Sequence, residues 1–142
     1  VTSDFHSNIE NIWDKIQDVD TLREICRPKA SFISCDDSPM LWEEGRSFVF
    51  KLFLHGFLPV GRHTINVVKM DKASREIDTK EYNDTIIIWN HYIKMEEISQ
   101  QVTRYTDTVD LYAGCFTSIA AWWTLKFYKH RQRKWQIIAK SL

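Results

Sequence analysis

The spacing of apolar residues changes twice along this chain, near residue 30 and after Gly114, and these changes limit the folds it can adopt. Across residues 30–112, apolar and polar residues alternate with a period of two, which is typical of half-buried strands. After Gly114, apolar residues recur at helical spacing to the end of the chain. Strands that are grouped in the sequence, with helices segregated from them, predict an α+β fold.

The alternating region contains a series of predicted strands. They cover residues 31–34, 48–54, 62–70, 75–82, 86–97 and 101–112. Turn-forming residues separate them at 36–39, 71–72, 83–84 and 99–100. Strands joined by short connections pair antiparallel, because parallel pairing needs a long crossover. The region therefore predicts a curved antiparallel sheet of six to seven strands.

Two short helices are predicted ahead of the sheet. Ser7 and Glu10 have the spacing of a capping box, and the apolar residues that follow them have helical spacing. A second helix is expected to begin near Asp20 and to end before Pro28, because the residue before a proline is disfavoured in a helix.

One long helix is predicted after Gly114. It spans about 25 residues, or about 37 Å at 1.5 Å per residue, which is enough to cross a small sheet. Projected at about 100° per residue, its apolar side chains share one face. These side chains are Phe116, Ile119, Ala120, Trp123, Phe127 and Ile138. No linker-like composition interrupts the chain, so residues 1–142 are expected to form a single domain.

The last two predicted strands place a polar pair on a buried face. If the numbers of opposed residues sum to about 200, one face of the pair is apolar and the other is polar, and a one-residue slip would mix them. His91 and Asp107 then lie on the apolar face as diagonal neighbours. A buried carboxylate needs a partner, so we expect the two to pair. The pair is either a core pair that fixes the register, or a polar anchor or general acid–base in a cavity.

Composition and charge exclude several classes of protein. Lys plus Arg is 19 and Asp plus Glu is 19, whereas a protein that mainly binds nucleic acid needs a basic excess. No segment reaches the ~20 apolar residues of a membrane span, and no signal-peptide pattern opens the sequence. Cys26, Cys35 and Cys115 lack metal-ligand spacing, and three unpaired thiols fit a reducing cytoplasm. No motif indicates a metal or a cofactor.

Two further segments allow a functional and a structural interpretation. The apolar segment 55–61 is either a lid at a cavity mouth or a β-bulge region that packs under the long helix. The basic run 126–134 either binds an anionic head group or phosphate, or is a solvated helix face whose long stems cover apolar surface. Arg131 and Lys134 project nearest to the apolar face of the helix.

The strand pair and the long helix also carry a family resemblance. The residues concerned are IWNH at 88–91, VTRYTDTVD at 102–110, the pair Trp122-Trp123, Phe127, and HRQRKW at 130–135. These residues resemble the SRPBCC (START-like) superfamily of polyketide cyclase and lipid-transport type, in an uncharacterised branch. The resemblance covers nearly the whole chain and implies the helix-grip fold, with a short first strand before Ser7. It also implies a cavity between the sheet and the C-terminal helix.

The resemblance leaves three functions open. The first is binding or transport of a hydrophobic small molecule or lipid, which a fully filled interior would exclude. The second is a cyclase- or aromatase-like enzyme that uses His91 and Asp107. The third is a protein-interaction module of co-chaperone type, with a filled core and an exposed patch. We favour binding over catalysis, and the sequence indicates neither the ligand nor the oligomeric state.

Aromatic richness supports a cavity, although it also fits a filled core. The chain has six Trp and eight Phe, and small-molecule pockets are mostly apolar and aromatic with a few polar groups. The predicted ligand-binding residues are Phe48, Phe50, Leu52, Ile65, Val67, Trp89, His91, Ile93, Asp107, Val109, Ile119, Trp123 and Phe127.

Overall fold

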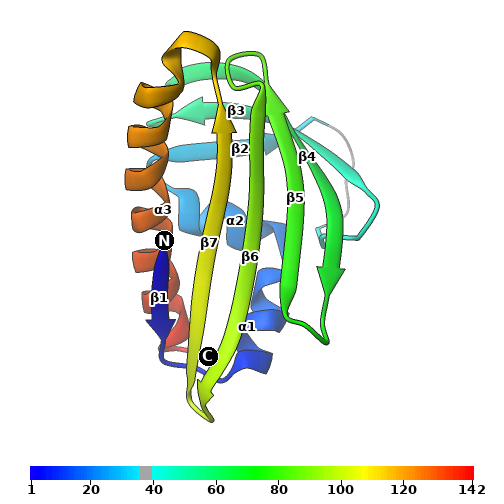
Figure 1. Ribbon diagram of the computed structural model, residues 1–142, viewed down its shortest axis with the longest axis vertical. Coiled ribbons are helices and arrows are strands. Elements are labelled where there is room, and N and C mark those ends of the chain that lie inside the picture. Colours follow the sequence, from blue (N-terminus) through cyan, green and yellow to red (C-terminus); the bar gives the residue numbers. More distant parts are fainter. Residues whose placement is uncertain (36–39) are drawn as a thin grey trace.

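A computed structural model describes residues 1–35 and 40–142, in which a curved antiparallel sheet wraps around one long helix (Figure 1). Its strands are β1 (Thr2–Phe5), β2 (Ala30–Ser34), β3 (Ser47–Leu54), β4 (Leu58–Asp71), β5 (Glu76–Asn83), β6 (Ile88–Ser99) and β7 (Val102–Tyr112). Within the described ranges they form one sheet in the order β1-β7-β6-β5-β4-β3-β2. The predicted α+β fold and strand meander are confirmed. The turn predicted at 36–39 lies outside the described residues.

The helices lie on one side of this sheet. They are α1 (Ile9–Ile16), α2 (Val19–Cys26) and α3 (Thr117–Ala139), and a short 3₁₀ turn η1 (Gly114–Phe116) precedes α3. Figure 1 shows α3 running beside β7 and β1, and α3 also packs against α2. α2 also contacts β2 and so joins the long helix to the sheet, while α1 packs against α2, β6 and β7.

The register predicted for the last two strands is confirmed. Trp89 lies opposite Leu111 and Ile93 lies opposite Asp107 across β6 and β7. His91 and Asp107 are consequently diagonal neighbours on the inward face. The outer edge of β7 pairs with β1, where Thr2 lies opposite Thr106, so the short first strand is present.

The predicted capping box at the first helix is wrong. Asn8 is the N-cap, and its side-chain oxygen accepts a hydrogen bond from the backbone N–H of Asn11 at 2.8 Å. Ser7 is buried instead, and its carbonyl accepts a hydrogen bond from the hydroxyl of Thr103. Asparagine and serine are comparable caps, so residue type alone does not choose between neighbours. The second helix begins at Val19 with Asp18 as its cap, slightly before the predicted start.

The apolar face predicted for the long helix is only partly buried. Phe127 is buried, whereas Phe116 and Ile119 are 64% and 72% exposed. The helix buries a neighbouring set instead, which includes polar residues: Thr124, Phe127, Tyr128, Arg131, Gln132, Trp135 and Ala139. The difference arises because the first half of α3 borders an opening rather than packed core.

Residues 55–61 do not form one loop. β4 already begins at Leu58, so the connection between β3 and β4 is a short turn, with a register shift between Leu52 and Phe53. Phe57 at this turn is 78% exposed. The segment is therefore a hairpin with a bulge, as the structural interpretation expects, but its exposed tip does not pack under the long helix.

Candidate functional site

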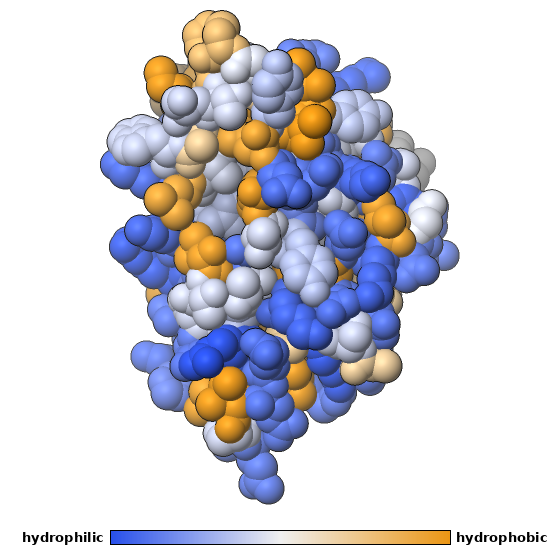
Figure 2. Space-filling model, viewed as in Figure 1, coloured by the Kyte–Doolittle hydropathy of each residue, from blue (hydrophilic) through white to orange (hydrophobic). Residues whose placement is uncertain are grey.

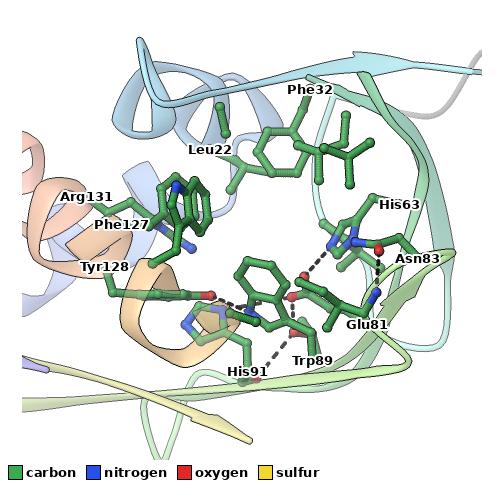
Figure 3. Close-up of a pocket in the computed structure, with 18 of the residues that line it drawn as sticks. Leu22, Phe32, His63, Glu81, Asn83, Trp89, His91, Phe127, Tyr128 and Arg131 are labelled. Carbon is green, nitrogen blue, oxygen red and sulfur yellow. Dashed lines mark hydrogen bonds and ion pairs between the residues drawn. The ribbon is translucent and has the colours of Figure 1, made fainter. Parts of the chain in front are cut away.

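A cavity of about 540 Å³ lies between the sheet and the first half of α3. This volume falls within the range of about 300–1,000 Å³ that is usual for small-molecule sites. Apolar side chains make up most of its wall, because strands present alternate residues to their inner face. Ile65, Val67 and Ile77 come from the sheet, and Leu22 and Phe32 close the side next to α2 (Figure 3).

The cavity has an apolar mouth at the start of α3. Phe116, Ile119 and Trp122 line the cavity, yet each is more than half exposed. The ammonium group of Lys126 lies 3.9 Å from the centre of the Trp122 ring. Figure 2 shows apolar surface gathered at this end of the molecule, around the start of α3 and the loop between β5 and β6. The start of α3 therefore gives the mouth an apolar side, with the ammonium group of Lys126 beside it.

Most of the predicted ligand-binding residues lie in the wall of this cavity. The sheet contributes those at inward positions of β3, β4 and β6, and α3 contributes the rest. They are Leu52, Ile65, Val67, Trp89, His91, Ile93, Ile119, Trp123 and Phe127.

The structure places the other four predicted residues away from the cavity. Phe48 and Phe50 are buried beneath Trp42, whose ring centre lies 4.8 Å and 6.2 Å from theirs, so packed core fills the space in front of them. Asp107 and Val109 instead border a separate hollow of about 190 Å³ between β7 and α3. Only one member of the predicted His91–Asp107 pair therefore faces the cavity.

His91 and Asp107 form the expected buried pair. The Nε2 atom of His91 donates to Oδ1 of Asp107 at 2.7 Å, and the side-chain amide of Gln132 on α3 donates to Oδ2 at 2.8 Å. Burial raises the pKa of Asp107, but the hydrogen bond from His91 and the charges of His91 and Arg131 outweigh it, and the pKa is lowered. The carboxylate is thus ionised, and it holds the ring of His91 in one orientation.

A second histidine–carboxylate pair, which the sequence did not predict, lies in the cavity wall. His63 donates from Nε2 to Glu81 at 2.8 Å, while the side-chain amide of Asn83 donates to Nδ1 of His63 at 3.1 Å (Figure 3). The hydroxyl of Thr79 donates to the other oxygen of Glu81 at 2.6 Å. The signal was present, because Thr79, Glu81 and Asn83 continue the inward-facing alternation of β5.

The two pairs approach each other across the sheet. Nδ1 of His91 lies 3.9 Å from Oε1 of Glu81. Burial raises the pKa of Glu81, but the hydrogen bonds from His63 and Thr79 outweigh it, so the pKa is lowered. Two ionised carboxylates and two histidines therefore form one buried polar band, and His63, Glu81 and His91 face the cavity.

The indole of Trp89 joins this band to α3. Its Nε1 donates to the hydroxyl of Tyr128 at 3.2 Å. The Tyr128 ring packs edge-on against the ring of His91, with the two ring centres 4.9 Å apart. Figure 3 shows these side chains on the floor of the cavity, below Phe127.

Within residues 1–35 and 40–142, no group of three or more His, Cys, Asp or Glu side chains is arranged to hold a metal ion. None of the described helices is both long and apolar enough to cross a bilayer.

Solved structures of low sequence identity share this fold over nearly the full length of the chain. Protein CV1439 from Chromobacterium violaceum aligns with a TM-score of 0.72 at 6% identity, covering 98% of this chain and 94% of its own. Ara h 8.0201 aligns with a TM-score of 0.69 at 10% identity, covering 100% of this chain and 96% of its own. A START superfamily protein from Mycobacterium smegmatis aligns with a TM-score of 0.68 at 9% identity, covering 99% of this chain and 95% of its own.

These likenesses identify the fold as START-like, which confirms the resemblance noted in the sequence at the level of architecture. No family model matches the chain, and no curated protein matches it.

Proposed function

We propose that this protein binds a hydrophobic small molecule or lipid in the cavity between the sheet and α3, and that it holds or carries this ligand unchanged. The cavity itself supports the proposal. Protein interiors are normally close-packed, and the walls of an apolar void lose dispersion contacts. A cavity of about 540 Å³ with an apolar mouth is therefore best explained by a ligand that restores those contacts.

Native mass spectrometry of the gently purified protein tests this function. A co-purified molecule should appear as a constant mass increment that is lost on denaturation. As a second arm, 1-dodecanol should change the fluorescence of Trp89 and Trp123, which line the cavity, in a saturable way. The proposal would be contradicted if the purified protein carried no bound molecule and also showed no saturable binding of an apolar probe.

A second candidate function is acid–base catalysis on the bound molecule. The observation that favours it is the backing of His91 by Asp107, because a carboxylate that orients a histidine is a common arrangement for a general base. His63 with Glu81 repeats the arrangement in the same wall. The filled core expected of a protein-interaction module does not fit the cavity.

His91→Gln separates catalysis from binding. Incubation of the protein with its co-purified molecule should produce a change in mass of that molecule, and His91→Gln should abolish this change with little loss of thermal stability. If the variant loses stability and no mass change occurs with the wild type, the pair is structural.

We also propose that the protein works in the cytoplasm. Cys26, Cys35 and Cys115 are all free thiols, which fits a reducing compartment. Burial raises the pKa of the Cys26 thiol to about 12, so this thiol stays protonated and packs as an apolar side chain.

A further inference from the structure

A buried cation lies at the inner end of the cavity. Arg131 lines the cavity from α3 and is only 6% exposed. No residue in the described part of the chain accepts a hydrogen bond from it, and no carboxylate there lies within ion-pair distance, 4.0 Å, of its guanidinium. Figure 3 shows the side chain reaching from α3 toward the cavity beside Phe127. A guanidinium has five N–H donors and stays protonated, so this arrangement leaves its hydrogen-bonding capacity unused.

Aromatic rings hold Arg131 in place without satisfying those donors. The central carbon of its guanidinium lies 4.6 Å from the centre of the Tyr128 ring and 5.8 Å from that of Phe127. Cation–π contacts of this kind stabilise the charge modestly. The effective penalty for burying an unpaired ion is larger. The contacts therefore fix the orientation of Arg131 but do not replace an anion.

The buried carboxylates near Arg131 are already bound by other donors. Asp107 accepts hydrogen bonds from His91 and Gln132, and Glu81 accepts them from His63 and Thr79. Arg131 acts on Asp107 only as a distant charge that lowers its pKa. The protein thus pairs both anions of this region with neutral or titratable donors and leaves its permanent cation facing the cavity.

We propose that the ligand is an amphipathic anion whose acidic head binds Arg131 and whose apolar body extends along α3 to the mouth. This inference rests on the proposed binding function and assigns the ligand's chemical class. A carboxylate or a phosphate monoester suits the head, because each accepts two parallel hydrogen bonds from a guanidinium. Ile119 at the mouth and Arg131 are separated by about 18 Å of helix at 1.5 Å per residue, which defines the length available to the body.

The remaining polar groups of the wall set the position of the head. Glu81 is ionised and would repel an acidic head at the sheet side, while His63 and His91 are already engaged with carboxylates. Among the described residues of the cavity wall, the unpaired buried donors are those of Arg131, on the α3 side of the inner end. The polar band of the sheet and the buried Arg131 of α3 therefore select one orientation of the ligand.

Matched ligands of one chain length test this inference. Calorimetric titrations compare dodecanoate, dodecyl phosphate and 1-dodecanol on the wild type and on Arg131→Met, with the two anions below their critical micelle concentrations and the alcohol below its solubility limit. We expect one or both anions to bind wild type at least about tenfold more tightly than the alcohol, because hydrogen bonds between charged groups are about twice as strong as those between neutral ones. Arg131→Met should remove that preference and leave binding of 1-dodecanol within about threefold of wild type.

Two further variants control for charge and for folding. Arg133→Met removes an exposed cation from the same helix and should leave the anion preference unchanged. Arg131→Lys keeps the charge but not the forked geometry, so it should retain part of the preference. It replaces Arg131→Met in the test if that variant fails to fold. Which anion binds more tightly distinguishes a carboxylate head from a phosphate head.

Equal binding of the anions and the alcohol to wild type would overturn the inference and leave the proposed binding function standing. The same holds if Arg131→Met weakens all three ligands equally. If none of the three ligands binds, the inference and the proposed function both fail.

Discussion

The interior of this protein has a filled half and a hollow half, and both are rich in aromatic residues. In the filled half, the ring of Phe5 from β1 stacks with those of Tyr105 of β7 and Trp135 of α3, with ring centres 5.0 Å and 5.9 Å apart. In the hollow half, Trp123 stacks on Phe127 at 4.8 Å, so one residue of α3 covers another. The difference teaches that aromatic content does not determine whether a core is filled, because stacking along the helix leaves space in front of the sheet.

The N-terminal segment accounts for the difference. β1 pairs with β7 and packs against the second half of α3, and α1 contacts β6 and β7 beside it. The first half of α3 faces β3 to β6 across the cavity instead. The same long helix is thus core at one end and cavity wall at the other.

The largest expected effect is on the filled half. Trp135 is fully buried, so Trp135→Ala should destabilise the protein by about 3–5 kcal/mol through lost burial and a new cavity. Trp123→Ala should cost clearly less, because Trp123 is only partly buried and one side of it already faces a cavity. Urea denaturation followed by circular dichroism measures both, and equal losses would show that the two halves are packed alike.

Removing the carboxylate of Asp107 should have the next largest effect. Asp107→Ala leaves the buried donors of His91 and Gln132 without their acceptor, which costs about 1–3 kcal/mol for each unsatisfied group. Asp107→Asn keeps an acceptor and should lose less. The free energy of unfolding in urea distinguishes them, and a neutral effect of Asp107→Ala would contradict a structural role for the band.

Acid should weaken the protein through the same band. The folded-state pKa values of Asp107 and Glu81 lie below their ordinary values of 3.8 and 4.5. As the pH falls through these ordinary values, the unfolded chain takes up protons before the folded protein does, so stability is complete above about pH 5 and is lost below it. Thermal melting between pH 6 and pH 3 should show this loss, and Asp107→Asn should flatten it. A stability that is independent of pH in this range would contradict the ionised state of both groups.

The smallest expected effect concerns the mouth. Ile119 is 72% exposed, so Ile119→Ser should change the free energy of unfolding by no more than about 0.5 kcal/mol. It should nevertheless slow the uptake of 1-dodecanol in stopped-flow fluorescence, because the ligand passes this side chain. Unchanged uptake would place the entry route elsewhere.

The sequence predicted the architecture well because its periodicity is strong. Alternation fixed the strands and the register of β6 with β7, and a one-residue slip would have moved every side chain to the other face. The helix cap was harder, since Ser7 and Asn8 are adjacent and equally suited, and only the packing of Ser7 beneath Thr103 decides between them.

The site was less predictable because it depends on which elements come into contact. Inward-facing positions could be named from alternation, but alternation does not show that Trp42 covers Phe48 and Phe50, or that the N-terminal strand fills one half only. Glu81 was detectable as an inward carboxylate in β5, and its partner His63 required the pairing of neighbouring strands. Arg131 was recognised as lying near the apolar face, yet its burial without a partner is visible only in the structure.

The central claim, that the hollow half is a binding site, is tested most directly by filling it. Val67 and Val68 are neighbours on β4, with Val67 lining the cavity and Val68 47% exposed on the outer face. Calorimetric titration with 1-dodecanol should show that Val67→Trp reduces affinity at least about tenfold, while Val68→Trp binds as the wild type does. Unchanged binding by a folded Val67→Trp variant would contradict the claim.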